Sequence, residues 1–119
     1  MNYLSDVRIC VTKKHLKILK NELYKINSNL LDICDLKKEI ISTDNKKYVV
    51  LGWNNIEWYL NYVDVFTILK VLKKFKADGI TFNYFKIGIG INNFEIDSCF
   101  EKNDPNNNVK LLNTMLATV

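Results

Sequence analysis

The sequence contains very little arginine, histidine, proline or glycine. Of its 17 basic residues only Arg8 is an arginine, and its 119 residues include one histidine, one proline and four glycines. Arginine holds phosphate groups and guanine edges through two parallel hydrogen bonds, which the point charge of a lysine does not reproduce. Base-specific recognition of DNA is therefore not expected of this chain.

Long apolar runs and paired cysteines are also missing. No stretch reaches the ~18 apolar residues of a membrane-spanning helix, and the first residues lack the basic and apolar regions of a secretory signal. The three cysteines, Cys10, Cys34 and Cys99, are widely spaced and form no C-x-x-C pair, so neither a disulfide framework nor a zinc knuckle is indicated. We expect reduced thiols, a cytosolic location and no membrane partner.

The sequence does contain enough apolar material for one folded domain. Hydrophobic residues make up 48% of the chain and charged residues 25%, which is typical of a globular domain whose core needs no disulfide or metal. We expect this domain over residues 1–100, followed by a polar loop and a weakly amphipathic tail over residues 101–119. The net charge of +4 is mild, and lysine, asparagine and isoleucine share AT-rich codons, so we interpret most lysines as solvation and codon bias.

Hydrophobic periodicity predicts a series of short strands and two helices. Thr12 is expected to cap the first helix and Asp64 the second, with Gly79 ending the second helix in a left-handed conformation. In both helices the lysines lie opposite an apolar stripe. The predicted strands are residues 7–11, 38–42, 47–53, 80–88 and 94–96, and the predicted helices begin near residues 13 and 64.

The β-α-β-β-α-β order of the first six of these elements is that of the ferredoxin-like sandwich. We therefore predict an α+β fold in which an antiparallel sheet carries two helices on one face, with a C-terminal extension. The other face of the sheet would be open to solvent, to the tail or to another molecule, and an exposed edge at the last strand would favour a homodimer.

No set of residues predicts catalysis. His15 stands among lysines that lower its proton affinity, and a pair of Cys10 with His15 lacks a third orienting group. The run from Asp32 to Asp35 has no metal-ligand spacing, and the segment 88–93 lacks the lysine and helix start of a phosphate-binding loop. Glu57, Glu95 and Asp97 have no spacing that pairs them. We expect no catalytic residue, metal or cofactor, and hence not an enzyme.

Two surfaces are candidates for binding. The first is an aromatic segment that also holds two acids: Glu57, Trp58, Tyr59, Tyr62 and Asp64. Trp and Tyr dominate protein interfaces, although core closure around the second helix explains the same residues. The second is a nucleic-acid surface that combines the sheet face with a lysine-rich helix: Lys70, Lys73, Lys74, Lys76, Tyr84 and Lys86.

Residues 47–97 resemble a group of small proteins of unassigned activity that are encoded by phages and plasmids of low-GC Gram-positive and related bacteria. The segments that carry the resemblance are Leu51-Gly52-Trp53-Asn54-Asn55-Ile56-Glu57-Trp58-Tyr59, Asp64-Val65, Asp78-Gly79-Ile80, Phe85-Lys86-Ile87-Gly88 and Glu95-Ile96. In that group the last strand ends in Arg-Ile-Gly-Glu, whereas here Lys86 replaces the arginine and Ile89 the acid.

The resemblance implies a mobile-element origin, in which small domains without a catalytic set inhibit host defence systems. The expected function is therefore a non-enzymatic inhibitor of the anti-CRISPR type that occupies the surface of a host protein or ribonucleoprotein complex through the aromatic segment. The alternative is a small nucleic-acid-binding module.

Overall fold

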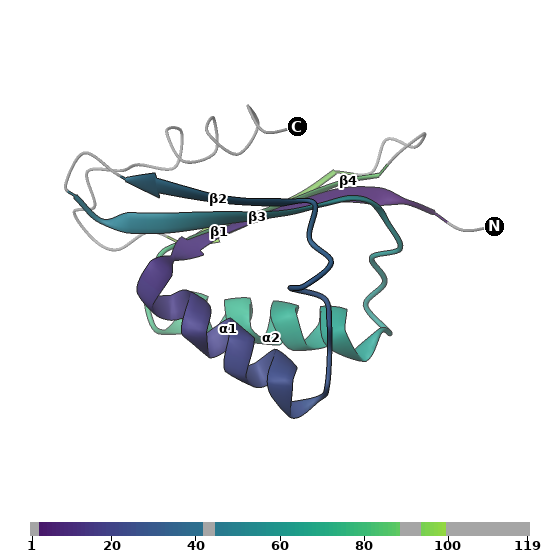
Figure 1. Ribbon diagram of the computed structural model, residues 1–119, viewed down its shortest axis with the longest axis horizontal. Helices are drawn as coiled ribbons and strands as arrows, with labels where there is room; N and C mark the ends of the chain where they lie inside the picture. Colours follow the sequence, from purple (N-terminus) through teal and green to yellow (C-terminus); the bar gives the residue numbers. More distant parts are fainter. Residues whose placement is uncertain (1–2, 42–44, 89–93, 100–119) are drawn as a thin grey trace.

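The computed structural model describes residues 3–41, 45–88 and 94–99, in which the chain forms a sheet with two helices below it (Figure 1). Each predicted strand and helix is present, with shifted ends. In chain order the elements are β1 (Ser5–Thr12), α1 (Lys13–Lys25), β2 (Leu36–Ile41), β3 (Lys47–Ile56), α2 (Val63–Ala77), β4 (Phe82–Gly88) and β5 (Phe94–Cys99). The predicted tail, residues 101–119, lies outside the described residues.

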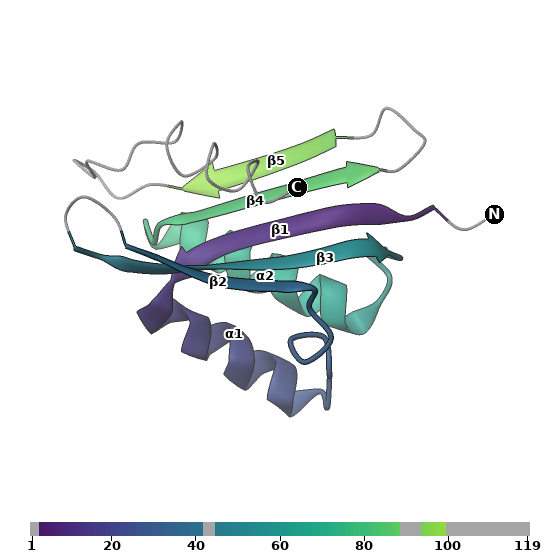
Figure 2. The same cartoon turned by 45° about the horizontal axis from the view of Figure 1, so that its top comes forward.

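The five strands lie in the order β2-β3-β1-β4-β5, and each neighbouring pair is antiparallel (Figure 2). The predicted α+β class, with one antiparallel sheet and two helices, is confirmed. The order of elements differs from the predicted β-α-β-β-α-β because β5 follows β4 at the edge of the sheet. This strand runs past its predicted end at Ile96, because its pairing with β4 continues to Cys99 opposite Phe82.

The two helices begin for different reasons. Thr12 caps α1 as predicted, since its Oγ1 accepts a hydrogen bond from the backbone N–H of His15 at 3.1 Å. The predicted cap at Asp64 is wrong: the capping position of α2 is Tyr62, without a side-chain hydrogen bond, and Asp64 lies in the first turn, where a carboxylate favours the positive end of the helix dipole. Gly79 follows α2 with the expected positive φ of 71°. Neither described helix has the length and apolar character needed to cross a bilayer.

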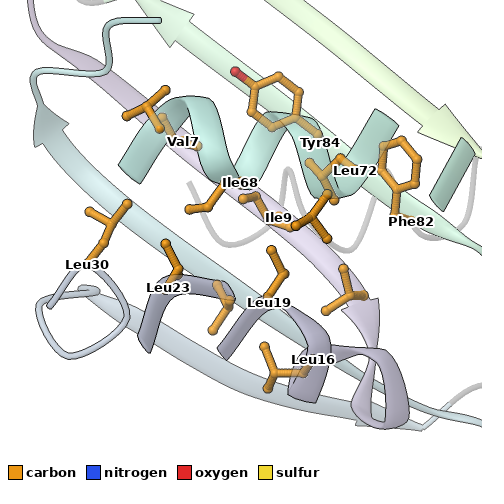
Figure 3. Close-up of a cluster of buried hydrophobic side chains, with 14 of the residues drawn as sticks. Val7, Ile9, Leu16, Leu19, Leu23, Leu30, Ile68, Leu72, Phe82 and Tyr84 are labelled. Atoms are coloured by element: carbon orange, nitrogen blue, oxygen red, sulfur yellow. The ribbon is translucent and has the colours of Figure 1, made fainter. Parts of the chain in front are cut away.

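The main core lies between the sheet and the helices. Its side chains come largely from alternate residues of the central strands and from one stripe of each helix, and they include Val7, Ile9, Leu16, Leu19, Leu23, Ile68, Leu72, Phe82 and Tyr84 (Figure 3). Each fully buried Leu, Ile or Phe contributes about 1.5–3 kcal/mol relative to its exposed state. Leu30, in the connector that follows α1, joins this core, and its carbonyl accepts a hydrogen bond of 2.8 Å from the Trp53 indole N–H.

The two helices run antiparallel across the sheet. At one end, Ser28 after α1 donates a hydrogen bond of 3.4 Å to Asp64 at the start of α2. At the other end, the ring of His15 near the start of α1 packs edge-on against Phe75 near the end of α2, with 5.7 Å between the ring centroids. The faces of both helices that point away from the sheet therefore form one continuous outer layer, which we call the helix layer.

A smaller cluster lies on the sheet face away from the helices. Cys10, Tyr48, Val50 and Phe85 are buried there, with Leu36, Ile40 and Ile87 packed around them. The only arginine of the sequence, Arg8, points to this same face and is 2% exposed. Its guanidinium donates to the carbonyls of Val7 and Trp53 at 3.0 and 3.3 Å and to the Asn54 Oδ1 at 2.8 Å. Burial lowers the pKa of Arg8, an effect that the charges of Asp6 and Asp35 oppose. Because its guanidinium is buried and hydrogen-bonded within the sheet, Arg8 is a structural residue.

Candidate protein-binding surface

The aromatic segment before α2 is only partly a surface. Trp58 was predicted as a contact residue, but its side chain is 3% exposed and packs on Trp53 with 5.3 Å between the rings. It belongs to the main core, because the segment turns back under the end of β3 and the indole closes the space beside α2. For Trp58 the structure therefore supports the alternative interpretation of core closure, and contact of Trp58 with a partner stays a prediction.

The neighbouring tyrosines hold the segment in place. The Tyr59 hydroxyl accepts a hydrogen bond of 2.7 Å from the Tyr3 N–H and donates one of 3.0 Å to the Tyr3 carbonyl. The Tyr62 hydroxyl donates to the Glu57 carboxylate at 2.6 Å, and this hydrogen bond is the main reason that the pKa of Tyr62 is raised. The two rings meet edge-on at 5.2 Å. Both hydroxyl groups already have hydrogen-bond partners within the chain. Neither tyrosine therefore has an unpaired hydroxyl that would support the prediction that it binds a partner.

Some of the exposed apolar side chains lie at the start of α2 and on the neighbouring α1, where the sequence interpretation had not placed a site. Leu60, Val63 and Phe66 are 64%, 63% and 52% exposed, and Ile18 on α1 is 41% exposed. We call these four residues the apolar patch. A signal for it exists in the sequence: Val63 and Phe66 fall off the buried stripe of α2 formed by Val65, Ile68, Leu72 and Phe75, in positions where a solvated helix normally carries polar residues.

Three residues of the apolar patch line a groove between the antiparallel helices. The groove has a volume of about 740 Å³, and its floor contains the buried Val71 and Phe75. Its other lining residues are Ile18, Glu22, Lys25, Ile26, Val63, Phe66, Thr67, Lys70, Lys74, Asp78 and Ile80. An apolar floor with polar groups at its edges has the composition of a protein-binding groove.

The two helices are strongly basic. The two helices hold nine of the 17 basic residues of the chain but only two of its 13 acidic residues, Glu22 and Asp64. Their combined charge is thus +7, and the rest of the chain carries −3. The two helices are well separated in the sequence, and the fold places both of them on the same side of the sheet (Figure 1).

The residues predicted to bind nucleic acid do not form one surface. Tyr84 points into the main core and is 4% exposed, because β4 turns it toward the helices (Figure 3). Lys86 is largely buried, at 15% exposure, with its ammonium 3.9 Å from Glu95. Lys70, Lys73, Lys74 and Lys76 are exposed on α2, on the opposite side of the sheet from the face that holds Cys10 and Phe85. The proposed combination of sheet face and lysine-rich helix is therefore absent.

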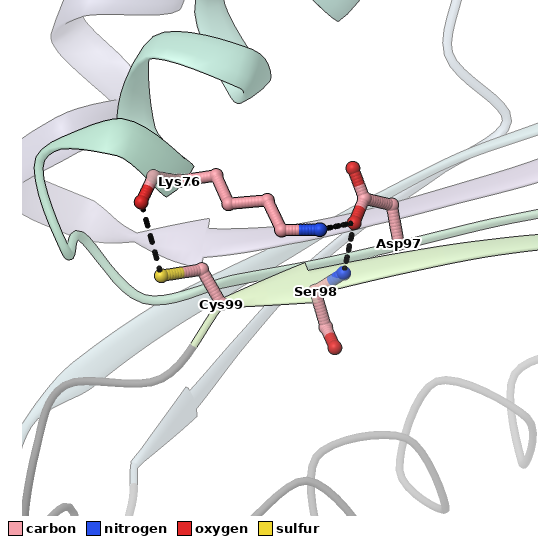
Figure 4. A network of polar contacts seen from close by, with 4 residues as sticks. All are labelled: Lys76, Asp97, Ser98 and Cys99. Atoms are coloured by element: carbon pink, nitrogen blue, oxygen red, sulfur yellow. Dashed lines mark hydrogen bonds and ion pairs between the residues drawn. The ribbon is translucent and has the colours of Figure 1, made fainter.

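One of these lysines connects α2 to the edge strand. The Lys76 ammonium lies 2.7 Å from the Asp97 carboxylate of β5, and this hydrogen bond is the main cause of the raised pKa of Lys76 (Figure 4). The same carboxylate oxygen accepts the backbone N–H of Ser98 at 2.9 Å, and the Cys99 thiol lies 3.9 Å from the Lys76 carbonyl. Lys76 therefore has an internal structural contact.

The groups considered for catalysis are separated or neutralised. Cys10 lies on the sheet face away from the helices, so the fold keeps it apart from His15, and burial raises the pKa of the Cys10 thiol to about 12. Glu57 is hydrogen-bonded to Tyr62, while Glu95 and Asp97 each face a lysine.

A metal site and a phosphate-binding loop are the remaining sites that the sequence raised. Within residues 3–41, 45–88 and 94–99, no three His, Cys, Asp or Glu side chains converge in a way that would hold a metal ion. Of the segment 88–93, considered as a phosphate loop, only Gly88 lies inside the described residues.

Comparison with known proteins adds no assignment to this geometry. No protein family, curated protein or solved structure matches the chain.

Proposed function

We propose that this chain is a non-enzymatic binding protein that contacts a partner protein through the groove of the helix layer and the apolar patch beside it. The observation that carries the proposal is the exposure of Leu60, Val63 and Phe66, each more than half exposed, next to an apolar groove. Single exposed apolar residues are ordinary, whereas a cluster rimmed by polar groups is typical of an interaction site. A partner that covers Phe66 would remove a large aromatic side chain from water, and aromatic side chains contribute strongly to protein interfaces.

The resemblance of residues 47–97 to phage- and plasmid-encoded proteins extends this proposal. On that basis the partner is a host protein or ribonucleoprotein complex of a defence system, of the kind that anti-CRISPR proteins inhibit, and the chain acts in the cytosol of a bacterial host. We also propose that the six elements from β1 to β4 correspond to the ferredoxin-like arrangement, with β5 as an added edge strand. The 2-3-1-4 order of the first four strands supports this.

Nucleic-acid binding is the second candidate, and one observation favours it. The net charge of +7 on the two helices attracts any polyanion. The apolar floor of the groove weighs against it, because contacts to a phosphate backbone come from charged and polar groups.

A pull-down tests the proposed function. The full chain is immobilised and exposed to a lysate of a low-GC Gram-positive bacterium, with and without nuclease, beside two variants. Phe66→Ala removes the largest side chain of the apolar patch. Tyr24→Ala is the matched control, because Tyr24 is an aromatic residue of α1 that is 77% exposed and lies outside the groove.

We expect specific proteins to be retained by the wild type and by Tyr24→Ala, with or without nuclease. Retention by Phe66→Ala should fall by about 30-fold, as for an interface hot spot worth ~2 kcal/mol. Equal retention by Phe66→Ala and the wild type, or loss of all retained protein after nuclease treatment, would contradict the proposal.

A further inference from the structure

The rim of the groove between α1 and α2 carries a defined pattern of charge. On α2, Phe66, Lys70 and Lys74 recur every four residues, so that they form one row along the outer edge of the groove. Val71 and Phe75 lie deeper, as the floor. A molecule in the groove therefore meets an apolar floor and, along one side, an aromatic ring followed by two ammonium groups.

Some of the charged side chains on this rim form ion pairs, and others do not. On the α1 side, Lys25 pairs with Glu22 at 3.0 Å, which neutralises both. Lys70 and Lys74 are exposed, and in the part of the chain that the structure describes neither ammonium group is within ion-pair distance of a carboxylate. Asp78 is the remaining acid of the lining. The groove thus has two free cations on one rim, between helices whose combined charge is +7.

We infer that the groove receives an amphipathic helix of a partner protein, whose apolar stripe is flanked by acidic residues. This inference rests on the proposed function and names the partner's chemistry. A third helix fits because two packed helices leave a groove that accepts the side-chain ridges of another helix. Recognition of an amphipathic helix in an apolar groove uses anchors spaced three or four residues apart. Acidic flanks place carboxylates opposite Lys70 and Lys74.

A nucleic acid fits this surface less well. Single-stranded chains bind by stacking bases on successive exposed aromatic rings. In this groove Phe66 is exposed, but the second ring, Phe75, is 2% exposed and packs in the core. Phosphates placed over Val71 and Val63 would lose water without gaining a hydrogen bond there. The lysines attract both a nucleic acid and an acidic helix, whereas the apolar floor favours the helix.

Binding of designed peptides to the full chain tests the inference, measured by fluorescence anisotropy. The acidic probe is a helical peptide with leucines in one stripe and glutamates beside it. The second probe has lysine in place of each glutamate, the third has the acidic composition in an order without a stripe, and the fourth is a single-stranded oligonucleotide. The protein variants are Phe66→Ala, Lys70→Glu/Lys74→Glu, and Lys38→Glu/Lys47→Glu, a control that changes the net charge equally on exposed residues of β2 and β3.

We expect the acidic probe to bind more tightly than the other three. Lys70→Glu/Lys74→Glu should weaken it by at least about ten-fold, because two attractions become repulsions, and Phe66→Ala should weaken it as well. The control should bind like the wild type. A measurement without variants supports the same conclusion: raising salt from about 0.1 M to about 1 M shortens the screening length from about 10 Å to about 3 Å, which should weaken binding of the acidic probe but not that of the lysine probe.

Other results overturn the inference in distinguishable ways. Equal binding of the acidic, lysine and scrambled peptides, or no effect of Lys70→Glu/Lys74→Glu, refutes the acidic helix. If Phe66→Ala nevertheless lowers retention in the pull-down, the proposed function stands without the acidic-helix inference. Tighter binding of the oligonucleotide, in competition with the acidic peptide, assigns the helix layer to nucleic acid and overturns both proposals.

Discussion

Replacement of Trp58 by alanine tests whether the aromatic segment is core or contact surface. The Trp58 side chain is 3% exposed and packs at 5.3 Å on Trp53. A buried aromatic side chain removes about 150–250 Å² from water, which at about 25 cal/mol per Å² corresponds to about 4–6 kcal/mol. The β-carbon remains in alanine and the site partly collapses, so we expect a loss of about 3–5 kcal/mol in the free energy of unfolding.

Urea unfolding, followed by far-UV circular dichroism, measures this loss. With a slope of about 2 kcal/mol per M, the midpoint should fall by about 1.5–2.5 M. Trp58→Phe keeps part of the packing and should give an intermediate midpoint if the alanine variant does not fold. Phe66→Ala is the surface comparison, since its side chain is 52% exposed, and should stay within about 0.5 kcal/mol of the wild type. A cost below about 1 kcal/mol for Trp58→Ala would refute the core placement.

Three further substitutions follow from local geometry. In Gly52→Ala the added Cβ would lie 2.9 Å from the Arg8 Nη1, and overpacking of this buried guanidinium should cost about 1–3 kcal/mol in urea unfolding; a neutral result would mean that Arg8 moves freely. Gly79→Ala meets no atom within 4 Å, but φ is 71°, so we expect about 1–2 kcal/mol from backbone conformation alone, checked in the same assay. Native Cys10, with a pKa of about 12, should resist iodoacetamide at pH about 8 while the partly exposed Cys34 is labelled, as peptide mass spectrometry would show. Because the unfolded state releases the Cys10 proton near pH 8.5 and the native state holds it to about pH 12, the free energy of unfolding should fall as pH rises between these values. Cys10→Val should remove that part of the fall.

Much of the secondary structure could be predicted because the local pattern was strong. Alternation in β1, the Thr12 cap and the apolar stripe of each helix all appear as expected. The start of α2 was less predictable, since Asp64 suits both the capping position and the first turn, and the residues around it decided between them. Trp58 was ambiguous for a different reason: large aromatic side chains are used equally in cores and in interfaces, so composition could not assign it.

The candidate site could be predicted only in part. The exposed Val63 and Phe66 follow from helical periodicity, once the buried stripe of α2 is drawn. The groove could not be predicted in this way, because it is made by two segments separated by about half of the domain. Tyr84 and Phe85 show the same limit: alternation places them on opposite faces of a strand, but only the position of the helices decides that Tyr84 lies in the main core.

The sequence by itself determined the α+β class, the antiparallel sheet with two helices and the absence of any recognisable catalytic motif, because these depend on periodicity and spacing along the chain. Only the tertiary structure decided how the lysine-bearing helices are arranged in space. Along the sequence the lysines follow two separate solvent-facing helix faces, a pattern that indicates solvation and codon bias. Antiparallel packing of α1 and α2 places two helices of combined charge +7 on one side of the sheet and forms an apolar groove between them, with Lys25, Lys70 and Lys74 in its lining. Electrostatic fields add in space, so this surface exists only in the folded chain.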